Sequence, residues 1–144
     1  MSRVKIKFPE QNSALYSTII AVRIGDINYG GHMGNDAVLS VIHEARMQML
    51  NNWGYTELEI DGTGLIMADV MIAYKGEAFY GNKLYITLYA TEVTEHSFDL
   101  LYHIKTDEKD IAHGKTGMLC FDYKARKIVT MPQSLKNRLT MVDF

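Results

Sequence analysis

The fold of this chain is decided by residues 35–52, which read NDAVLSVIHEARMQMLNN. Apolar residues recur here at the three- and four-residue spacing that places side chains on one face of an α-helix. They are Val38, Val41, Ile42, Ala45 and Met49, and the arc is widened by Leu39, Met47 and Leu50. A helix that is apolar over so wide an arc is buried on more than one side. We therefore predict a buried helix over residues 35–52.

Segments with strand patterns lie on both sides of this helix in the sequence. Alternating apolar and β-branched residues predict strands over 18–24, 65–75, 84–93, 97–105 and 111–123. Short turns between the later segments favour antiparallel pairing. A short helix is predicted near Pro132, with Leu135 and Leu139 on one face. This order predicts an α+β fold in which one curved antiparallel sheet wraps around a single long central helix, with the outer face and edges of the sheet open to a partner subunit.

The composition is that of an ordinary globular protein, with 47% hydrophobic and 22% charged residues, and it predicts one domain over residues 1–144. A net charge of -2 argues against a nucleic-acid partner, which would need a basic face. Cys120 is the only cysteine, so we expect a buried thiol in a cytoplasmic protein. Residues 1–10 are too polar for a signal peptide. No apolar run reaches the about 18 residues of a membrane span, so no membrane association is expected.

A glycine-rich loop, residues 25–34, precedes the helix and is where we expect the chemistry. Its glycines let the backbone approach a ligand closely and adopt positive φ. At the start of a helix, unpaired N–H groups and the positive end of the helix dipole favour an oxyanion. We predict that the backbone around Gly31, Gly34 and Asn35 stabilises the oxyanion formed when a thioester carbonyl is attacked. Asn35 or Asp36 is expected to cap the helix.

Five side chains in or near the loop are candidates for catalysis: Asp26, Asn28, His32, Asp36 and Glu44. A carboxylate or an imidazole can activate a water molecule as a general base. Glu44 lies with Ser40 and Gln48 in a polar stripe that interrupts the apolar helix, which favours a polar cleft there. The alternatives without catalysis are turn and helix capping by the two aspartates, a hydrogen bond from His32 to the loop backbone, and pairing of Glu44 with Arg23 or water.

Two motifs carry a resemblance to a known family: DINYGGHMGN at residues 26–35 and EAR at residues 44–46. They are similar to the pattern Asp-x-Asp-x-x-Gly-His-x-Asn-Asn, followed along the helix by Glu-Ala-Arg, of the 4-hydroxybenzoyl-CoA thioesterase-like branch of the hotdog superfamily. Weaker similarities to that family occur at residues 74–77, 81–83, 114–117 and 131–132. The resemblance implies a hotdog fold, an acyl-CoA thioesterase activity and a homodimer or homotetramer.

Asn28 departs from the family pattern. In the best-understood members the second aspartate of Asp-x-Asp is the catalytic carboxylate, and here that position is an amide. An amide cannot act as a general base, but it can orient a water molecule or donate a hydrogen bond to the thioester oxygen. The carboxylate must then come from Asp26, Asp36 or Glu44. Plant acyl-carrier-protein thioesterases, which look related, use Asn and His in a similar loop, so a pairing of Asn28 with His32 is workable.

We therefore expect hydrolysis of a fatty or aromatic acyl-CoA to a free acid and CoA, without a cofactor. The alternatives are an acyl-carrier-protein thioesterase, a non-catalytic acyl-thioester-binding hotdog protein, and a hydratase or dehydratase of the same fold. A Gly-x-Ser-x-Gly motif is absent from the sequence, which argues against an α/β-type serine hydrolase.

Residues outside the loop supply further expectations. Lys75 and Lys83, and more weakly Arg126, are candidates to meet CoA phosphates from a neighbouring subunit. Flexible apolar side chains suit an acyl channel, and the candidates for it are Met67, Met71 and Tyr74. No metal is expected, because metal-ligand spacing is missing from the remaining histidines, His43, His96, His103 and His113.

Overall fold

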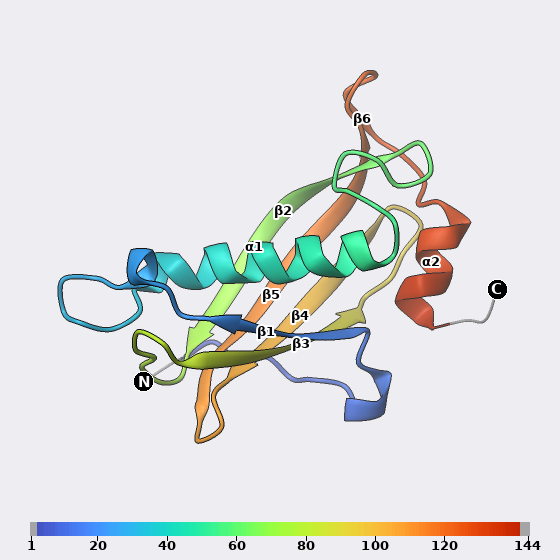
Figure 1. Ribbon diagram of the computed structural model, residues 1–144. Coiled ribbons are helices and arrows are strands. Elements are labelled where there is room, and N and C mark those ends of the chain that lie inside the picture. The colour runs from blue at the N-terminus through green and yellow to red at the C-terminus, as the bar shows by residue number, and fades with distance from the viewer. Residues whose placement is uncertain (1–2, 142–144) are drawn as a thin grey trace.

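The long helix α1 (Asn35–Asn52) lies across the concave side of a curled antiparallel sheet (Figure 1). The computed structural model describes residues 3–141. The buried side chains of α1 are Val38, Val41, Ile42, Ala45, Arg46, Met49 and Leu50. Ile42, Ala45 and Met49 have no exposed surface. The predicted helix is thus confirmed in its bounds and in the burial of its main apolar face. Of the residues expected to widen that face, Leu50 is buried, Met47 is half-buried and Leu39 is 37% exposed.

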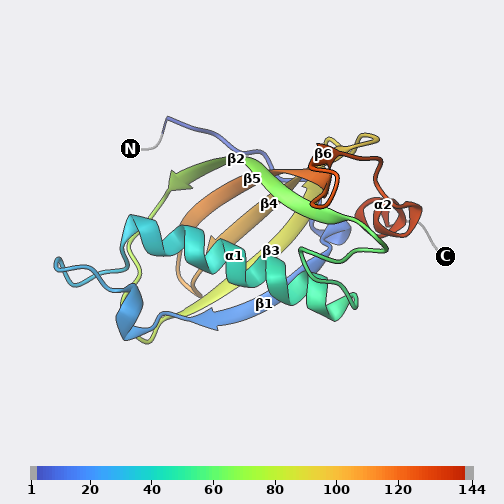
Figure 2. The same cartoon turned by 90° about the horizontal axis from the view of Figure 1, so that it is seen from above.

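In the described part of the chain, six antiparallel strands form the sheet, in the order β1-β3-β4-β5-β2, with β6 paired to β5. The strands are β1 (Tyr16–Ala21), β2 (Gly64–Tyr74), β3 (Lys83–Thr91), β4 (Ser97–Lys105), β5 (Asp110–Asp122) and β6 (Lys127–Ile128). Seen from above, the sheet curves around α1 from β1 on one side to β2 on the other (Figure 2). This is the expected α+β hotdog architecture.

The core lies between the helix and the concave face of the sheet. Successive side chains of a strand point to opposite faces, so alternate residues reach α1. Leu84, Ile86 and Leu88 of β3 are buried there, and so are Phe98 and Leu100 of β4. The period-two pattern predicted for these strands is confirmed.

The loop before α1 contains a helical turn that the sequence did not predict. β1 ends at Ala21 rather than at residue 24, and a short 3₁₀ helix, η2 (Ile24–Asp26), follows it. The expectation that Asn35 or Asp36 caps α1 is wrong, because the N-cap residue is Gly34, which has no side chain to offer. A Cβ on Gly34 would lie 2.6 Å from Oδ1 of Asp36. A side chain at the cap would therefore displace the Asp36 carboxylate from its position.

The predicted C-terminal helix is confirmed as α2 (Gln133–Thr140), with Pro132 at its N-cap and Leu135 and Leu139 buried. The sequence did not predict the short 3₁₀ helix η1 (Gln11–Ser13) or β6. Among residues 3–141, no helix has the length and apolar character needed to cross a bilayer.

Close packing of α1 on β5 at Gly114 gives the first prediction. A Cβ at this position would lie 2.6 Å from Cδ1 of Ile42. We expect Gly114→Ala to lower the free energy of unfolding by about 1–3 kcal/mol, because overpacking forces the helix or the sheet to shift. Urea unfolding followed by circular dichroism measures this change. Gly25→Ala is the control, since a Cβ there meets nothing within 4 Å. An equal urea midpoint for both variants would contradict the close packing.

Candidate active site

The glycine-rich loop closes on itself before it reaches α1. Ile27 and Met33 form an isolated antiparallel bridge, and the backbone N–H of Asn28 donates to the His32 carbonyl oxygen at 2.9 Å. Gly31 has a φ of 84°, a conformation that residues with a side chain rarely adopt. Residues 28–32 therefore form a tight turn directly before the helix.

Asp26 holds this loop together. Its side chain is only 7% exposed, and its carboxylate accepts a hydrogen bond from the Arg23 amide at 2.8 Å. The Arg23 guanidinium lies 3.6 Å from the other carboxylate oxygen. The Asp26 carbonyl oxygen accepts from the Gly34 amide at 2.9 Å. The amide of Gly34 is thus already used, and the N–H groups that a helix leaves without an intrahelical acceptor begin at Asn35.

Asn28 and His32 converge on Gly30. The side-chain oxygen of Asn28 accepts from the Gly30 amide at 2.9 Å, and His32 Nδ1 donates to the Met33 carbonyl oxygen at 3.1 Å. A Cβ on Gly30 would lie 3.2 Å from Oδ1 of Asn28 and 3.6 Å from Nε2 of His32. With the proton of the neutral ring on Nδ1, Nε2 of His32 is left as an acceptor.

Asp36 is the second residue of α1 and is exposed. Its carboxylate lies beside Gly34, at the positive end of the helix dipole, where negative charge is stabilised. This side chain lines a cleft between α1 and β2, which also contains His43, Arg46 and Glu57 and which we call the β2-side cleft.

Glu44 lies on the other side of the helix. It lines a cleft between α1 and β1 with Asp26, Ser40 and Gln48, which we call the β1-side cleft. The Gln48 amide donates to Glu44 at 2.8 Å, and Thr18 of β1 donates to Gln48 at 2.5 Å. Glu44 is therefore held in the predicted polar stripe, while Arg23 pairs with Asp26 instead of with it. The structure does not bring Glu44 and Asp36 into one cleft.

A buried polar network in the β2-side cleft was missed by sequence reasoning. The Arg46 side chain is 5% exposed, and its Nε lies 3.3 Å from Glu57. Arg46 also donates to the Tyr102 hydroxyl at 3.2 Å, and that hydroxyl lies 2.8 Å from the Thr116 hydroxyl. At the surface His43 donates to Glu57 at 2.7 Å. A charged residue within the apolar arc of the helix was the one available signal for this network.

Tyr102 stays a neutral phenol in this network. Burial is the largest influence and raises its pKa, whereas Arg46 and the hydrogen bond with Thr116 act in the opposite direction. The neutral hydroxyl can accept from Arg46 and donate to Thr116 at the same time. Both polar neighbours of the hydroxyl therefore have a partner.

A third cleft opens at the start of α1 and is lined by His32, Asn35, Tyr74 and Lys75, among others; we call it the helix-start cleft. The Tyr74 hydroxyl donates to the Asn35 carbonyl oxygen at 3.2 Å, which ties the end of β2 to the helix. Lys75, the residue after β2, lies in the same cleft as His32.

The other two cationic candidates lie elsewhere. Lys83, at the start of β3, lines a neighbouring depression with Phe79 and Asn82. Arg126 belongs to the turn before β6, at the opposite end of α1 from the loop (Figure 1). Within one chain, Lys75 is thus the candidate that shares a cleft with a loop residue.

Cys120 is a buried free thiol, as predicted. Burial raises the pKa of this thiol to about 11. Because the thiolate is the nucleophilic form of cysteine, Cys120 is unsuited to attack a thioester.

Comparison with known proteins agrees with this architecture. The family model described as the thioesterase-like superfamily matches residues 22–139. The chain therefore belongs to the thioesterase-like superfamily. The prediction that it is a thioester hydrolase is confirmed.

The individual proteins that the chain resembles share only a small fraction of its sequence. The 1,4-dihydroxy-2-naphthoyl-CoA hydrolase of Microcystis aeruginosa is 26% identical over 121 residues, covering 82% of this chain and 88% of the relative. Among solved structures, Slr0204, a 1,4-dihydroxy-2-naphthoyl-CoA thioesterase from Synechocystis, matches with a TM-score of 0.80, 21% identity and coverage of 90% and 98% of the two chains. BH1999 gentisyl-coenzyme A thioesterase matches with a TM-score of 0.77, 17% identity and coverage of 86% and 99%. The two structures establish the shared fold.

The Arg46 network gives a prediction on stability. We expect Glu57→Ala to lower the free energy of unfolding by about 2–3 kcal/mol, because it leaves the buried guanidinium without its carboxylate. Thermal and urea unfolding measure the loss. Glu95→Ala is the control, since the Glu95 side chain is 81% exposed. Equal stability of Glu57→Ala and Glu95→Ala would show that water replaces the Glu57 carboxylate as the partner of the Arg46 guanidinium.

Proposed function

We propose that this protein hydrolyses an acyl-CoA thioester with Asp36 as the general base. The observation that carries the proposal is the position of Asp36, an exposed carboxylate in the first turn of α1 beside the open amides of the helix start. The two other carboxylates are less suited. Asp26 is buried and bonded to Arg23, and Glu44 lies in the β1-side cleft.

The reaction needs one proton acceptor and one oxyanion site. Asp36 takes a proton from a water molecule, whose oxygen attacks the thioester carbonyl carbon. The carbonyl oxygen becomes negative and accepts hydrogen bonds from the backbone amides of Asn35 and Asp36. Collapse of this intermediate breaks the carbon–sulfur bond, and the leaving thiolate takes the proton back from Asp36. The products are a free acid and CoA.

Asn28 and His32 position the reactants in this proposal. Both side chains lie around Gly30, next to the start of the helix. His32 Nε2 can accept a hydrogen bond from the attacking water, and the side-chain NH₂ group of Asn28 can donate to the substrate. In this scheme Asn28, at the position of the family's usual catalytic carboxylate, only orients the substrate. Asp36 acts as the base.

The acyl group is proposed to be aromatic. A relative that is 26% identical is named a 1,4-dihydroxy-2-naphthoyl-CoA hydrolase, and a structural neighbour is named a gentisyl-coenzyme A thioesterase. Tyr74 and Met67 line the clefts beside β2 and offer apolar surface to a ring. Lys75, in the helix-start cleft, is the first candidate for a CoA phosphate, with Lys83 as the second.

Replacement of the proposed base tests the mechanism. We expect Asp36→Asn to lower kcat on an aromatic acyl-CoA by about 100- to 10,000-fold, the range that general bases contribute. Release of free CoA thiol, measured on a panel of short, long and aromatic acyl-CoAs, gives the rates. Glu44→Gln is the matched control, because it removes a carboxylate from the same helix in the other cleft, and we expect it to keep nearly full activity.

Four outcomes would contradict the proposal. Loss of activity in Glu44→Gln, but not in Asp36→Asn, would place the chemistry in the β1-side cleft. Saturable binding of every acyl-CoA without turnover would indicate a non-catalytic binding protein. Turnover only of acyl-carrier-protein thioesters, or hydration of an unsaturated acyl chain, would assign a different substrate or reaction.

We further propose that the chain, as one domain over residues 1–144, acts as a cytoplasmic homodimer. Within residues 3–141, β2 pairs along one side only, with β5. Met67 and Val70 of β2 are each 41% exposed, and Met71 is 39% exposed. An edge strand with unpaired backbone groups and apolar side chains is a template for another strand. A two-fold axis beside β2 would pair it with its own copy and place the partner against the β2-side cleft.

The dimer proposal is tested at Met71. We expect Met71→Lys to shift the protein from two chains to one in size-exclusion chromatography with light scattering, because a charge at the edge strand opposes pairing. Leu58→Lys is the control, since Leu58 is 70% exposed and precedes the strand. A monomeric wild-type protein, or an unchanged mass for Met71→Lys, would contradict the proposal.

A further inference from the structure

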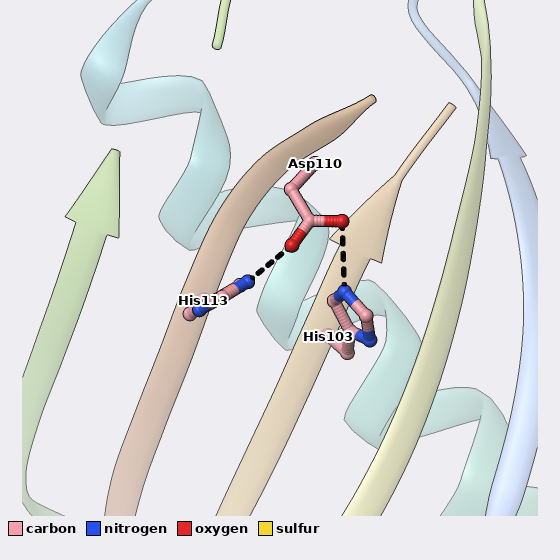
Figure 3. Close-up of side chains that lie close together, drawn as sticks. All are labelled: His103, Asp110 and His113. Carbon is pink, nitrogen blue, oxygen red and sulfur yellow. Dashed lines mark hydrogen bonds and ion pairs between the residues drawn. The ribbon is translucent and has the colours of Figure 1, made fainter. Parts of the chain in front are cut away.

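Two histidines and one aspartate meet on the outer face of the sheet. His103 belongs to β4, and Asp110 and His113 belong to β5 (Figure 3). His103 and His113 are direct partners in the β4–β5 register. Their chain neighbours Ile104 and Ala112 are buried against α1, so the two histidines point to the opposite face. The cluster is therefore separated from the proposed active site by the sheet itself.

One carboxylate connects the two rings. His103 Nε2 lies 3.0 Å from Oδ1 of Asp110, and His113 Nε2 lies 2.7 Å from Oδ2. All three ligand atoms lie within 4.8 Å of one another. Figure 3 shows both rings directed at the carboxylate from adjacent strands. Three side chains thus present their metal-binding atoms to one point.

Aromatic packing holds the rings in this orientation. Phe8 stacks on His103 with ring centroids 4.9 Å apart and contacts the edge of His113 at 5.0 Å. The two imidazoles meet edge to face at 5.1 Å. The side chain of His113 is 15% exposed and that of His103 is 28% exposed, whereas Asp110 is 43% exposed. The rings are therefore fixed, and solvent reaches the cluster from the Asp110 side.

The cluster carries the charge that a metal site needs. When two neutral imidazoles and one carboxylate bind an ion together, they form a ligand set of charge minus one, which attracts a divalent cation. Imidazole nitrogen favours transition metals over Mg²⁺ and Ca²⁺, which prefer oxygen ligands.

We propose that His103, Asp110 and His113 form a binding site for a divalent transition-metal ion such as Zn²⁺. The ligands are Nε2 of each imidazole and one carboxylate oxygen of Asp110, with water in the remaining position. A tetrahedral ion with bonds of about 2.0 Å separates its ligand atoms by about 3.3 Å. His103 Nε2 lies 3.0 Å from Oδ1 and His113 Nε2 lies 2.7 Å from Oδ2, so coordination through a single oxygen also needs a small rotation of the Asp110 carboxylate. The imidazole nitrogens, at most 4.8 Å apart, need only small side-chain rotations.

The bound ion would connect the two strands of the β4–β5 hairpin next to its turn. It would also fix the imidazole surface against which Phe8 packs. With three protein ligands the fourth position of the ion stays open to water, unlike that of a four-ligand structural site. The sequence did not reveal this site because β-strand pairing, rather than close spacing along the chain, brings His103 to Asp110 and His113.

Titration of untagged, metal-free protein with Zn²⁺ tests the proposal. We expect isothermal titration calorimetry to show one ion per chain. Loss of one ligand should weaken binding at least about 100-fold, because even the loss of a ligand's hydrogen-bond partner costs 10- to 100-fold. The variants are His103→Gln, Asp110→Asn and His113→Gln. His96→Gln is the control, since His96 lies outside the cluster and is bonded to the Val129 carbonyl oxygen; we expect it to bind as the wild type does.

Two further measurements separate a metal site from a simple hydrogen-bonded cluster. X-ray absorption of the zinc-loaded protein should show two imidazole ligands, and Zn²⁺ should raise the Tm of the wild type but not of His113→Gln. Circular dichroism establishes that each variant is folded. The proposal is overturned if wild-type protein binds no Zn²⁺ at one equivalent, if all three cluster variants bind it as tightly as the wild type, or if His96→Gln loses it.

Discussion

The contact between α1 and the concave face of the sheet removes Ile42, Ala45 and Met49 completely from water. Burial of a side chain the size of Ile or Met contributes about 1.5–3 kcal/mol, so this helix supplies a large part of the driving force for folding. A flat sheet could cover only one side of it. Because the apolar arc is wider than one side, the sheet curls from β1 to β2 around the helix axis. Gly114 allows the two layers to approach closely, since it places no Cβ against Ile42.

Burial of one face of the helix also determines where polar chemistry can occur. The exposed polar side chains of α1 lie at the helix ends and on the face that the sheet leaves open, next to a gap beside β1 and a gap beside β2. Glu44 lies in the first gap and Asp36 near the second, so two carboxylates of one helix face separate clefts. Arg46 is the exception, because it is buried and is stabilised by Glu57 and Tyr102. The helix start adds open amides that no side chain could replace.

The outer face of the sheet has a different chemistry from the inner face. Alternation along β4 and β5 places apolar residues toward α1 and His103 and His113 away from it. The register shift between Ile104 and Lys105 brings Asp110 to the same outer face. Phe8 covers part of this outer cluster, so the N-terminal segment takes part in its environment. A ligand bound there would act on the β4–β5 hairpin without reaching the loop at the start of the helix.

By itself, the sequence determined the elements and the class. Helical spacing over residues 35–52 and strand alternation predicted α1 and the five long strands, because both periods reflect which side chains leave water. The loop motif predicted where the open amides would lie and which family the chain resembles. Only the tertiary structure decided which groups meet: Asp26 with Arg23, Arg46 with Glu57, and His103 with Asp110. Such pairings depend on strand register, the direction of side chains and helix-to-sheet packing, and these are set by the whole folded chain rather than by local spacing.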